Sequence, residues 1–156
     1  DASGDAAGPA DVAQSAVSAV QTITPLAEAA GVTTAVDVDG APKARIPAAT
    51  LTRLCVALLD NAVQHAPVGS DVVLRAGSTG EAVQIRVSDR GHGVSAEDVE
   101  RIFERFARGS EAGRRRGFGL GLALVREAAA RYGGSVHIEQ TSPEGSTFLL
   151  TIPAAR

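Results

Sequence analysis

The segment Leu58-Leu59-Asp60-Asn61-Ala62-Val63-Gln64-His65 belongs to the most regular stretch of this chain. Apolar side chains recur there every three or four residues, which predicts an amphipathic helix packed against a core. Pro47 predicts the start of this helix, and Pro67-Val68-Gly69 predicts its end. The apolar stripe comprises Leu51, Leu54, Cys55, Leu58, Leu59 and Ala62. Asn61 lies beside that stripe, where an amide is costly to bury without a partner, so it is a candidate for a structural hydrogen bond or a ligand contact.

The chain before this helix predicts one further helix and one strand. Residues 12–26 carry apolar side chains at helical spacing, which predicts a helix that ends near Gly31. Residues 32–38 alternate apolar and polar side chains, with Ala35 out of step, which predicts a strand. Residues 1–10 contain only Asp, Ala, Ser, Gly and Pro, which is the composition of a linker, and we expect them to be poorly ordered.

Two hairpins and two helices are predicted after the central helix. Residues 72–87 and 136–152 each contain two alternating stretches joined by a turn, which predicts hairpins. Ser95 resembles the cap of a short helix that runs through Phe103. A longer helix is expected at residues 120–132, closed by two glycines. These elements predict an α+β fold, with a mixed sheet covered by helices and two glycine-rich loops.

Composition places the chain among soluble single domains. It has 156 residues, 44% hydrophobic and 21% charged, and residues 11–156 are expected to form one domain. The net charge of −3 argues against general affinity for nucleic acid, which needs a basic surface. No apolar run approaches the roughly 18 residues that cross a bilayer, so we expect no direct membrane insertion by this chain. The single cysteine, Cys55, is expected to be a small buried thiol.

A second candidate site is Asp89-Arg90-Gly91-His92-Gly93, which directly follows a predicted strand. Alternating glycines permit backbone conformations and close approaches that a side chain would block. A carboxylate at the end of a strand can accept a hydrogen bond from the exocyclic amine of adenine, which guanine does not present at the equivalent place. The alternative is a tight turn in which the aspartate is only a cap. The pattern alone leaves both interpretations open.

A third candidate site is the segment Gly117-Phe118-Gly119-Leu120-Gly121-Leu122 at the start of a predicted helix. Glycines there expose backbone N–H groups, and a helix N-terminus carries partial positive charge, so the segment suits phosphate. The spacing of its glycines differs from the dinucleotide fingerprint, and no strand comes directly before it. A P-loop is excluded because the chain has no Gly-Lys-Ser/Thr, and Lys43 is its only lysine, which also excludes the protein-kinase strand lysine.

The fourth segment, Phe103-Glu104-Arg105-Phe106, holds two of the four phenylalanines. One interpretation is a helix face packed on the core. The other is an anchor for the polar stretch that follows, at about residues 107–116. That stretch ends in Arg114-Arg115-Arg116, which is either a solvated basic loop or a source of cations that reach a phosphate.

In this order, the four segments resemble the N box, first glycine box, F box and second glycine box of the histidine-kinase ATPase family, within the superfamily of gyrase B, Hsp90 and MutL. The resemblance spans about residues 51–153. It implies a two-layer α/β sandwich, in which about three helices back a mixed sheet and ATP lies under a flexible lid. It also implies binding of Mg·ATP and transfer of the γ-phosphoryl group to a histidine in two-component signal transduction.

The resemblance further implies a role for each matching residue. Asn61 would hold Mg²⁺, Asp89 would bind the adenine amine, and His65 would lie near the nucleotide. Arg114, Arg115 and Arg116, in the lid, would spread the charge of the γ-phosphate in the transition state. The glycines of both boxes would shape the adenine pocket and frame the phosphates. The remaining expected contacts to ATP are Gly91, Gly93, Val94, Phe106, Gly117, Gly119, Leu120, Gly121 and Leu122.

Three positions depart from the family pattern. Ala57 stands where the family usually has a second asparagine, or a glutamate base in its ATP-hydrolysing members, so autonomous ATP hydrolysis is not expected. Gln64 stands where a lysine or arginine often contacts phosphate. Phe118 replaces a small residue between the glycines. We expect these changes to affect the rate of the reaction more than nucleotide binding.

The chain contains no histidine in a phosphoacceptor context. The family places an acidic residue and a Thr/Asn-Pro pair after that histidine, and His65, His92 and His137 have no such neighbours. The implied partners are therefore a histidine-bearing dimerisation domain, in cis or in trans, and a response regulator downstream. We expect the isolated domain to be monomeric, since the family's dimer contacts belong mainly to that other domain.

Two other functions stay open at the level of sequence. An anti-sigma-type serine kinase of the same superfamily would phosphorylate a small protein partner. A degenerate nucleotide-binding or docking module would transfer no phosphoryl group, as Ala57 and Gln64 would allow. The chain begins at Asp1 rather than methionine, which suggests a piece excised from a longer protein. We expect this piece to lie in the cytoplasm, as part of a membrane-bound sensor kinase.

Overall fold

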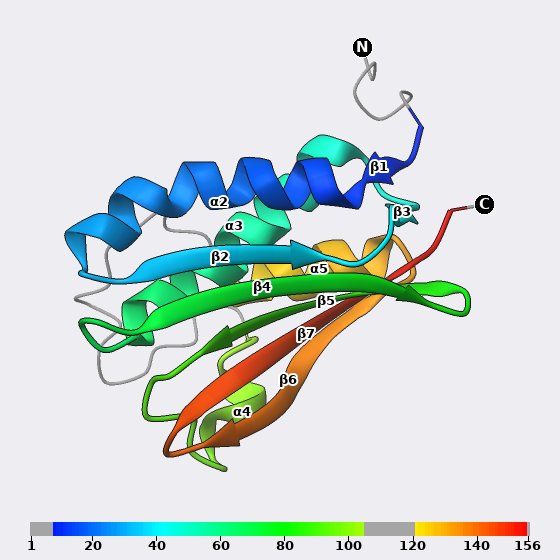
Figure 1. The fold of residues 1–156 in the computed structure, drawn as a ribbon. Coiled ribbons are helices and arrows are strands. Elements are labelled where there is room, and N and C mark those ends of the chain that lie inside the picture. Colours follow the sequence, from blue (N-terminus) through cyan, green and yellow to red (C-terminus); the bar gives the residue numbers. More distant parts are fainter. Residues whose placement is uncertain (1–7, 105–120, 156) are drawn as a thin grey trace.

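A computed structural model describes residues 8–104 and 121–155 of the chain. These residues form a two-layer α/β sandwich, in which helices cover one face of a five-stranded mixed sheet, as predicted (Figure 1). The described helices are α2 (Val12–Ala29), α3 (Ala48–His65), α4 (Asp98–Arg101) and α5 (Leu122–Arg131). The described strands are β1 (Ala10–Asp11), β2 (Thr33–Val38), β3 (Lys43–Ala44), β4 (Asp71–Thr79), β5 (Ala82–Asp89), β6 (Ser135–Ser142) and β7 (Gly145–Pro153).

The strands of the main sheet lie in the order β2-β4-β5-β7-β6. Strands β2 and β4 are parallel, with Val36 opposite Leu74, and helix α3 lies in the connection between them. The remaining neighbours are antiparallel, and the hairpins β4–β5 and β6–β7 are joined where β5 pairs with β7. This pairing places the end of β5 beside the start of β7, with Asp89 opposite Ser146.

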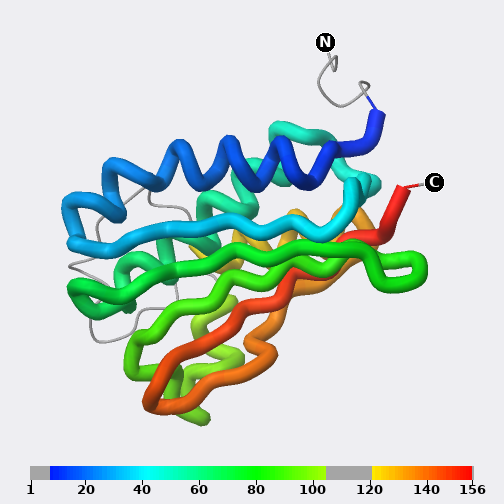
Figure 2. The backbone as a smooth tube through the Cα atoms, in the orientation of Figure 1, coloured from blue at the N-terminus to red at the C-terminus, as the bar shows by residue number. Residues whose placement is uncertain are grey.

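The core lies between the sheet and helices α2, α3 and α5, which form the second layer (Figure 2). Along β5 and along β4 as far as Ala76, every second side chain is buried, as the two-residue period of a strand requires. Helix α3 is the central helix, because 11 of its 18 residues are buried between α2 and the sheet. Side chains on α3 are therefore held in place on several sides, and Asn61 is one of them.

The predicted elements are confirmed with small shifts at their ends. The helix expected from residue 12 to near Gly31 is α2, and the strand expected at residues 32–38 is β2. Both predicted hairpins are present, and the helix expected at residues 120–132 is α5, whose described part begins at Leu122. No helix in the described part of the chain has both the length and the apolar character that crossing a membrane requires.

The predicted cap of the short helix is wrong. The N-cap residue of α4 is Glu97, without a side-chain capping hydrogen bond, and the helix begins only at Asp98. Ser95 instead takes part through its backbone, because its carbonyl oxygen accepts a hydrogen bond of 2.9 Å from the Asp98 N–H. This bond closes a turn before the helix, which moves the helix start away from Ser95.

Strands β1 and β3 have no counterpart among the predicted elements. Ala10, the last residue of the expected linker, pairs with Ala44 and is fully buried. Ala44 also forms an antiparallel bridge with Ala154, so the first described residues and the C-terminal strand end lie together (Figure 1). A strand of two residues is too short to show a periodic pattern, which is why the sequence does not indicate it.

Candidate functional site

Asp89 is the last residue of β5 and the buried polar centre of the candidate site. It is only 8% exposed, and one of its carboxylate oxygens accepts a hydrogen bond of 2.7 Å from the Gly91 N–H. The backbone N–H of Ser146, its cross-strand neighbour, also donates to the carboxylate. A carboxylate offers about four lone-pair positions, so these two bonds leave acceptor capacity for a ligand.

Two opposing effects set the electrostatics of Asp89. Burial raises the pKa of the Asp89 carboxyl above its ordinary value of 3.8, and this effect is the largest. The N–H groups of Gly91 and Ser146 and the nearby His65 and His92 rings act in the other direction and limit the rise in this pKa. A carboxylate kept at such a desolvation cost is typical of a binding or catalytic group.

The loop after Asp89 lies between the C-terminal end of α3 and the β6–β7 hairpin. A Cβ atom at Gly91 would lie 2.5 Å from the backbone oxygen of His65, so a side chain does not fit there. Gly93 has a φ of +86°, and a Cβ atom at this residue would collide with the backbone oxygen of Ser142. The two glycines therefore allow close backbone contacts on opposite sides of the loop.

Two residues of the β6–β7 hairpin support this loop, and sequence reasoning missed both. The Thr141 hydroxyl oxygen accepts a hydrogen bond of 2.8 Å from the backbone N–H of Val94, which is 47 positions away in the chain. The Thr141 hydroxyl also lies 2.8 Å from the hydroxyl of Ser146, a residue that is 5% exposed. In the sequence, both look like ordinary polar residues near a hairpin turn. Only their burial and their partners distinguish them.

Asn61 and His65 approach the loop from one turn of α3. Asn61 is 4% exposed, and its side-chain amide has no hydrogen bond to another described residue. The Nδ1 atom of His65 lies 2.8 Å from the backbone oxygen of Asn61, and since a carbonyl oxygen only accepts, Nδ1 carries the proton of this bond. The exposed rings of His65 and His92 meet edge to face, with their centroids 6.0 Å apart.

The two departures from the family pattern on α3 have different surroundings. Ala57 is 3% exposed and offers only a methyl group, one turn before Asn61. Gln64 is half-buried and its amide nitrogen donates to the Asp60 carboxylate at 3.1 Å. Gln64 is therefore engaged along its own helix. Neither residue supplies a cation or a base.

The start of α5 presents backbone N–H groups. Gly121 is the N-cap residue, with an extended backbone and no side-chain capping hydrogen bond, so the first N–H groups of α5 are suited to an anion. Leu122 follows it and is buried in the core, which holds this end of the helix in place. Helix α5 packs beside α3, where Ala57, Leu124 and Val125 line part of a hollow of about 210 Å³.

Phe103 is a core residue, as one of the two interpretations of the aromatic pair predicts. It is 2% exposed and its ring meets the ring of Phe148 edge to face, with centroids 6.0 Å apart. Several residues with expected roles lie outside the described part of the chain, and their roles stay predictions. They are Phe106, Arg114, Arg115, Arg116, Gly117, Phe118, Gly119 and Leu120.

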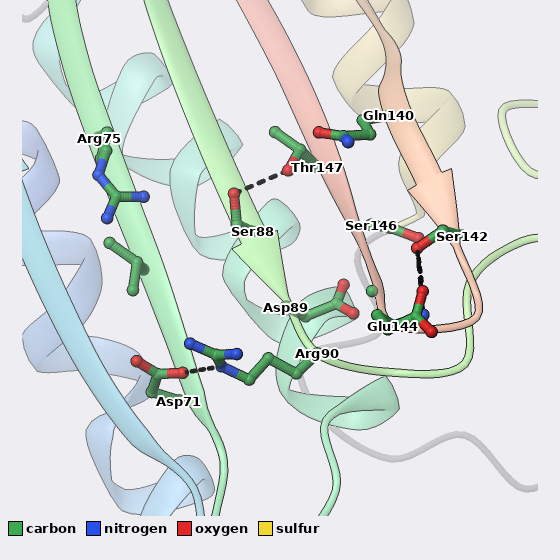
Figure 3. A pocket seen from close by; sticks show the side chains of 12 residues that line it. Asp71, Arg75, Ser88, Asp89, Arg90, Gln140, Ser142, Glu144, Ser146 and Thr147 are labelled. Carbon is green, nitrogen blue, oxygen red and sulfur yellow. Dashed lines mark hydrogen bonds and ion pairs between the residues drawn. The ribbon is translucent and has the colours of Figure 1, made fainter.

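A larger hollow of about 300 Å³ lies on the sheet face that the helices leave open (Figure 3). Polar groups along its wall already bind one another. The Arg90 guanidinium is 2.7 Å from the Asp71 carboxylate, and the Ser88 and Thr147 hydroxyls are 2.9 Å apart. Asp89 also borders this hollow (Figure 3), but Gly91, Gly93 and the N-terminus of α5 do not, so the loop that follows Asp89 is the better candidate site.

Comparison with known proteins identifies what this arrangement resembles. Residues 47–156 match the family described as "Histidine kinase-, DNA gyrase B-, and HSP90-like ATPase". The sensor-like histidine kinase SenX3 of Mycobacterium tuberculosis (strain ATCC 25618 / H37Rv) is 43% identical over 99 residues, which cover 62% of this chain and 24% of SenX3. The chain thus spans about a quarter of the length of such curated relatives.

Two solved structures show the same fold. The mycobacterial sensor histidine kinase MprB matches with a TM-score of 0.79 at 22% identity, over 94% of this chain and 96% of that one. Full-length ShkA, solved in complex with AMPPNP, matches with a TM-score of 0.81 at 29% identity, over 94% of this chain and 31% of that one. The match to MprB covers nearly the whole of both chains, so the sandwich and its connections are shared along their length.

Proposed function

The chain belongs to the histidine kinase-, DNA gyrase B- and HSP90-like ATPase family, and on that premise we propose that it binds Mg·ATP and supplies the γ-phosphoryl group to a histidine of a separate dimerisation domain. The observation that carries the proposal is the buried Asp89 carboxylate, held at the end of β5 before a loop in which Gly91 and Gly93 leave no room for a side chain. The chain is then the ATP-binding catalytic domain of a two-component sensor kinase.

Adenine recognition follows from the chemistry of Asp89. Its carboxylate accepts from the Gly91 and Ser146 N–H groups and accepts a further bond from the exocyclic amine of adenine. Guanine carries a carbonyl oxygen at that position, which would face the carboxylate without a proton between them. Such an unpaired buried contact costs about 1–3 kcal/mol, which corresponds to roughly ten- to hundredfold in affinity.

The phosphates lie at the N-terminus of α5 in this proposal. The N–H groups that follow Gly121 and the positive end of the helix dipole attract them. Mg²⁺ suits the residues present, since Asn61 is only 4% exposed and its side-chain amide oxygen has no hydrogen bond to a described residue. No group of three or more His, Cys, Asp or Glu side chains in residues 8–104 and 121–155 is placed to hold a metal, so phosphates and water supply the other ligands. When bound, Mg²⁺ neutralises phosphate charge.

The domain orients the phosphoryl donor and leaves the acceptor to its partner. Ala57 has no group that abstracts a proton from water, so bound ATP persists until a histidine is presented. The named relatives are histidine kinases about four times as long as the matched region, which supports a phosphoacceptor domain and a response regulator as partners. Phosphoryl transfer to a histidine then depends on positioning and charge stabilisation rather than on a covalent intermediate. We place this domain in the cytoplasm, where ATP is available.

Calorimetric titration of the chain with ATP and Mg²⁺ tests the first half of the proposal. Wild type should bind ATP, show at least about tenfold weaker binding of GTP, and lose most ATP affinity in Asp89→Asn. Asp71→Asn is the matched control, because Asp71 is an exposed carboxylate on the open sheet face and its loss should leave ATP affinity unchanged. Absence of ATP binding by folded wild type would overturn the proposal.

Phosphoryl transfer tests the second half. Incubation with labelled ATP and a histidine-bearing dimerisation domain from the same parent protein should give acid-labile phosphohistidine. Acid-stable phosphoserine on a partner would replace the proposal with the anti-sigma-type serine kinase. ATP binding with no transfer to the cognate domain would replace it with a nucleotide-dependent docking module.

A further inference from the structure

Arg126 makes two contacts that reach from α5 to the segment around α4. Its guanidinium donates a hydrogen bond of 2.9 Å to the carboxylate of Glu100, which lies in α4. The central carbon of the same guanidinium lies 5.3 Å from the centroid of the Phe103 ring, a distance at which a cation is attracted to the ring face. Arg126 therefore joins two parts of the chain that residues 105–120 separate in sequence.

These contacts connect the two ends of the proposed nucleotide site. On one side, Arg126 lies in the second turn of α5, whose first residues follow Gly121. On the other side, Phe103 packs on Phe148 of β7, two residues after Ser146, whose N–H donates to the Asp89 carboxylate. A continuous series of contacts thus runs from the helix N-terminus to the adenine-binding carboxylate.

Exposure indicates that this connection has little to do with overall stability. The side chain of Arg126 is 45% exposed and that of Glu100 is 73% exposed. Ion pairs of this kind contribute little to the free energy of unfolding, because water screens them and both side chains lose freedom. Phe103 also packs on Phe148 within the core. The consequence of the Arg126 contacts is therefore geometric: together with the buried Leu122, they constrain where α5 lies relative to Phe103.

We propose that Arg126 is a positioning residue for the nucleotide phosphates, acting by fixing the N-terminus of α5 at a set distance from the adenine-binding carboxylate of Asp89. The inference rests on the proposed function, since it assigns the phosphates to the start of α5. Arg126 does not touch ATP in this proposal. It keeps the backbone N–H groups at the start of α5 at the distance from Asp89 that allows them to bind the phosphates while adenine is bound at Asp89. Its loss should weaken recognition of the phosphates and spare recognition of adenosine.

The test compares the affinities of ATP and adenosine in wild type and in Arg126→Met, measured by NMR titration with Mg²⁺ present. Methionine keeps the length of the apolar stem and removes both the charge and the hydrogen bond. We expect ATP affinity to fall by about five- to tenfold, the size of effect that follows from small misplacement of a binding group, while adenosine affinity changes by less than about twofold. Arg126→Lys, which keeps a cation and a donor, should recover most of the ATP affinity.

Arg86→Met is the matched control. Arg86 also forms an exposed ion pair, with Glu139 at 2.7 Å, but on the open face of the sheet, and its loss should leave the ratio of ATP to adenosine affinity unchanged. Equal losses for ATP and adenosine in Arg126→Met would show a merely structural role and overturn the inference, as would an unchanged ATP affinity. If Arg126→Met fails to fold, Glu100→Gln gives the same comparison with the arginine retained. Wild type that binds no ATP would instead overturn the proposed function itself.

Discussion

At the scale of single residues, the candidate site includes polar side chains that are almost fully buried. Asp89 is the clearest example, because burial raises the pKa of its carboxyl, whereas the proposed contact with adenine uses the carboxylate as an acceptor. The Gly91 and Ser146 N–H groups offset part of this conflict by stabilising the anion. Asn61 is a second nearly buried polar residue, whose side-chain amide has no hydrogen bond to the other described residues. The proposed function gives both residues a ligand.

Replacement of Asp89 by asparagine should stabilise the fold at neutral pH while it removes ATP binding. A carboxyl whose pKa is raised in the folded state contributes stability below its unfolded value, near 3.8, and loses that contribution as pH rises through the folded pKa. The variant has no such loss, so its free energy of unfolding should exceed that of wild type at pH 7. The difference should shrink as the pH falls toward 4, as urea denaturation across this range would measure. A variant less stable than wild type at pH 7 would contradict this account.

At the scale of elements, the site depends on where three of them meet. The loop after β5 is enclosed by the end of α3 and by the tip of the β6–β7 hairpin. The Thr141 hydroxyl binds the Val94 N–H, and the Ser142 backbone lies against Gly93. The shape of the loop after β5 is therefore set by its neighbours as much as by its own glycines. A change in that packing should be measurable separately from a change in backbone conformation.

Gly93→Ala and Gly80→Ala separate these two effects. Both glycines have a positive φ, of +86° and +60°, so alanine is strained at either position by about 1–2 kcal/mol. Only Gly93 also has a neighbour, Ser142, that a Cβ atom would strike, while Gly80 in the β4–β5 turn has open space. Gly93→Ala should therefore lower the free energy of unfolding by roughly 1–3 kcal/mol more than Gly80→Ala. If urea denaturation shows that both variants lose the same free energy of unfolding, the loop after β5 accommodates the Cβ atom at residue 93 without a loss of stability.

At the scale of the whole molecule, the sandwich has one covered and one open sheet face, and the site lies at the end of the covered side. Helix α3 runs through the middle of the helical layer and carries Asn61 and His65 at its C-terminal end. Cys55 lies in the middle of the same helix and is 1% exposed, and burial raises the pKa of its thiol to about 12. Access to Cys55 therefore requires separation of the helices from the sheet.

Cys55 should report the global unfolding of this domain. The thiolate is the reactive form, so a buried thiol with a pKa of about 12 is inert near neutral pH. Since folded domains expose such groups in only about 10⁻³ of molecules or fewer, we expect the thiol to react at least about 10³-fold more slowly in buffer than in concentrated urea. A colorimetric thiol reagent measures both rates. Complete reaction of the native protein within minutes would show local opening around α3.

Local sequence patterns predict the elements and part of the site. The helical period around Leu51–Ala62 and the alternation in the two hairpins reflect burial on one face. This burial can be read from the order of apolar and polar residues within each segment. Asp89, Gly91 and Gly93 are also recognisable locally, because a carboxylate and two glycines follow a strand directly. The structure places Asp89 and Gly91 beside His65, which lies one helical turn after Asn61. The expected roles at residues 105–120 stay predictions, since that segment lies outside the described residues.

The family and the two-layer fold class follow from the sequence by itself, because they rest on motifs whose residues lie close together within each motif and whose order can be read along the chain. The adenine role of Asp89 and its glycines comes from the same motifs and stays a prediction. The pairing of Ala10 with Ala44, the support of Val94 by Thr141 and the contact of Arg126 with Glu100 were decided only by the tertiary structure. These partners are 47 positions apart in the case of Val94 and Thr141, and 26 in the case of Arg126 and Glu100. Periodicity reports that a side chain faces inward or outward, but not which distant group it meets, since that depends on how the layers pack.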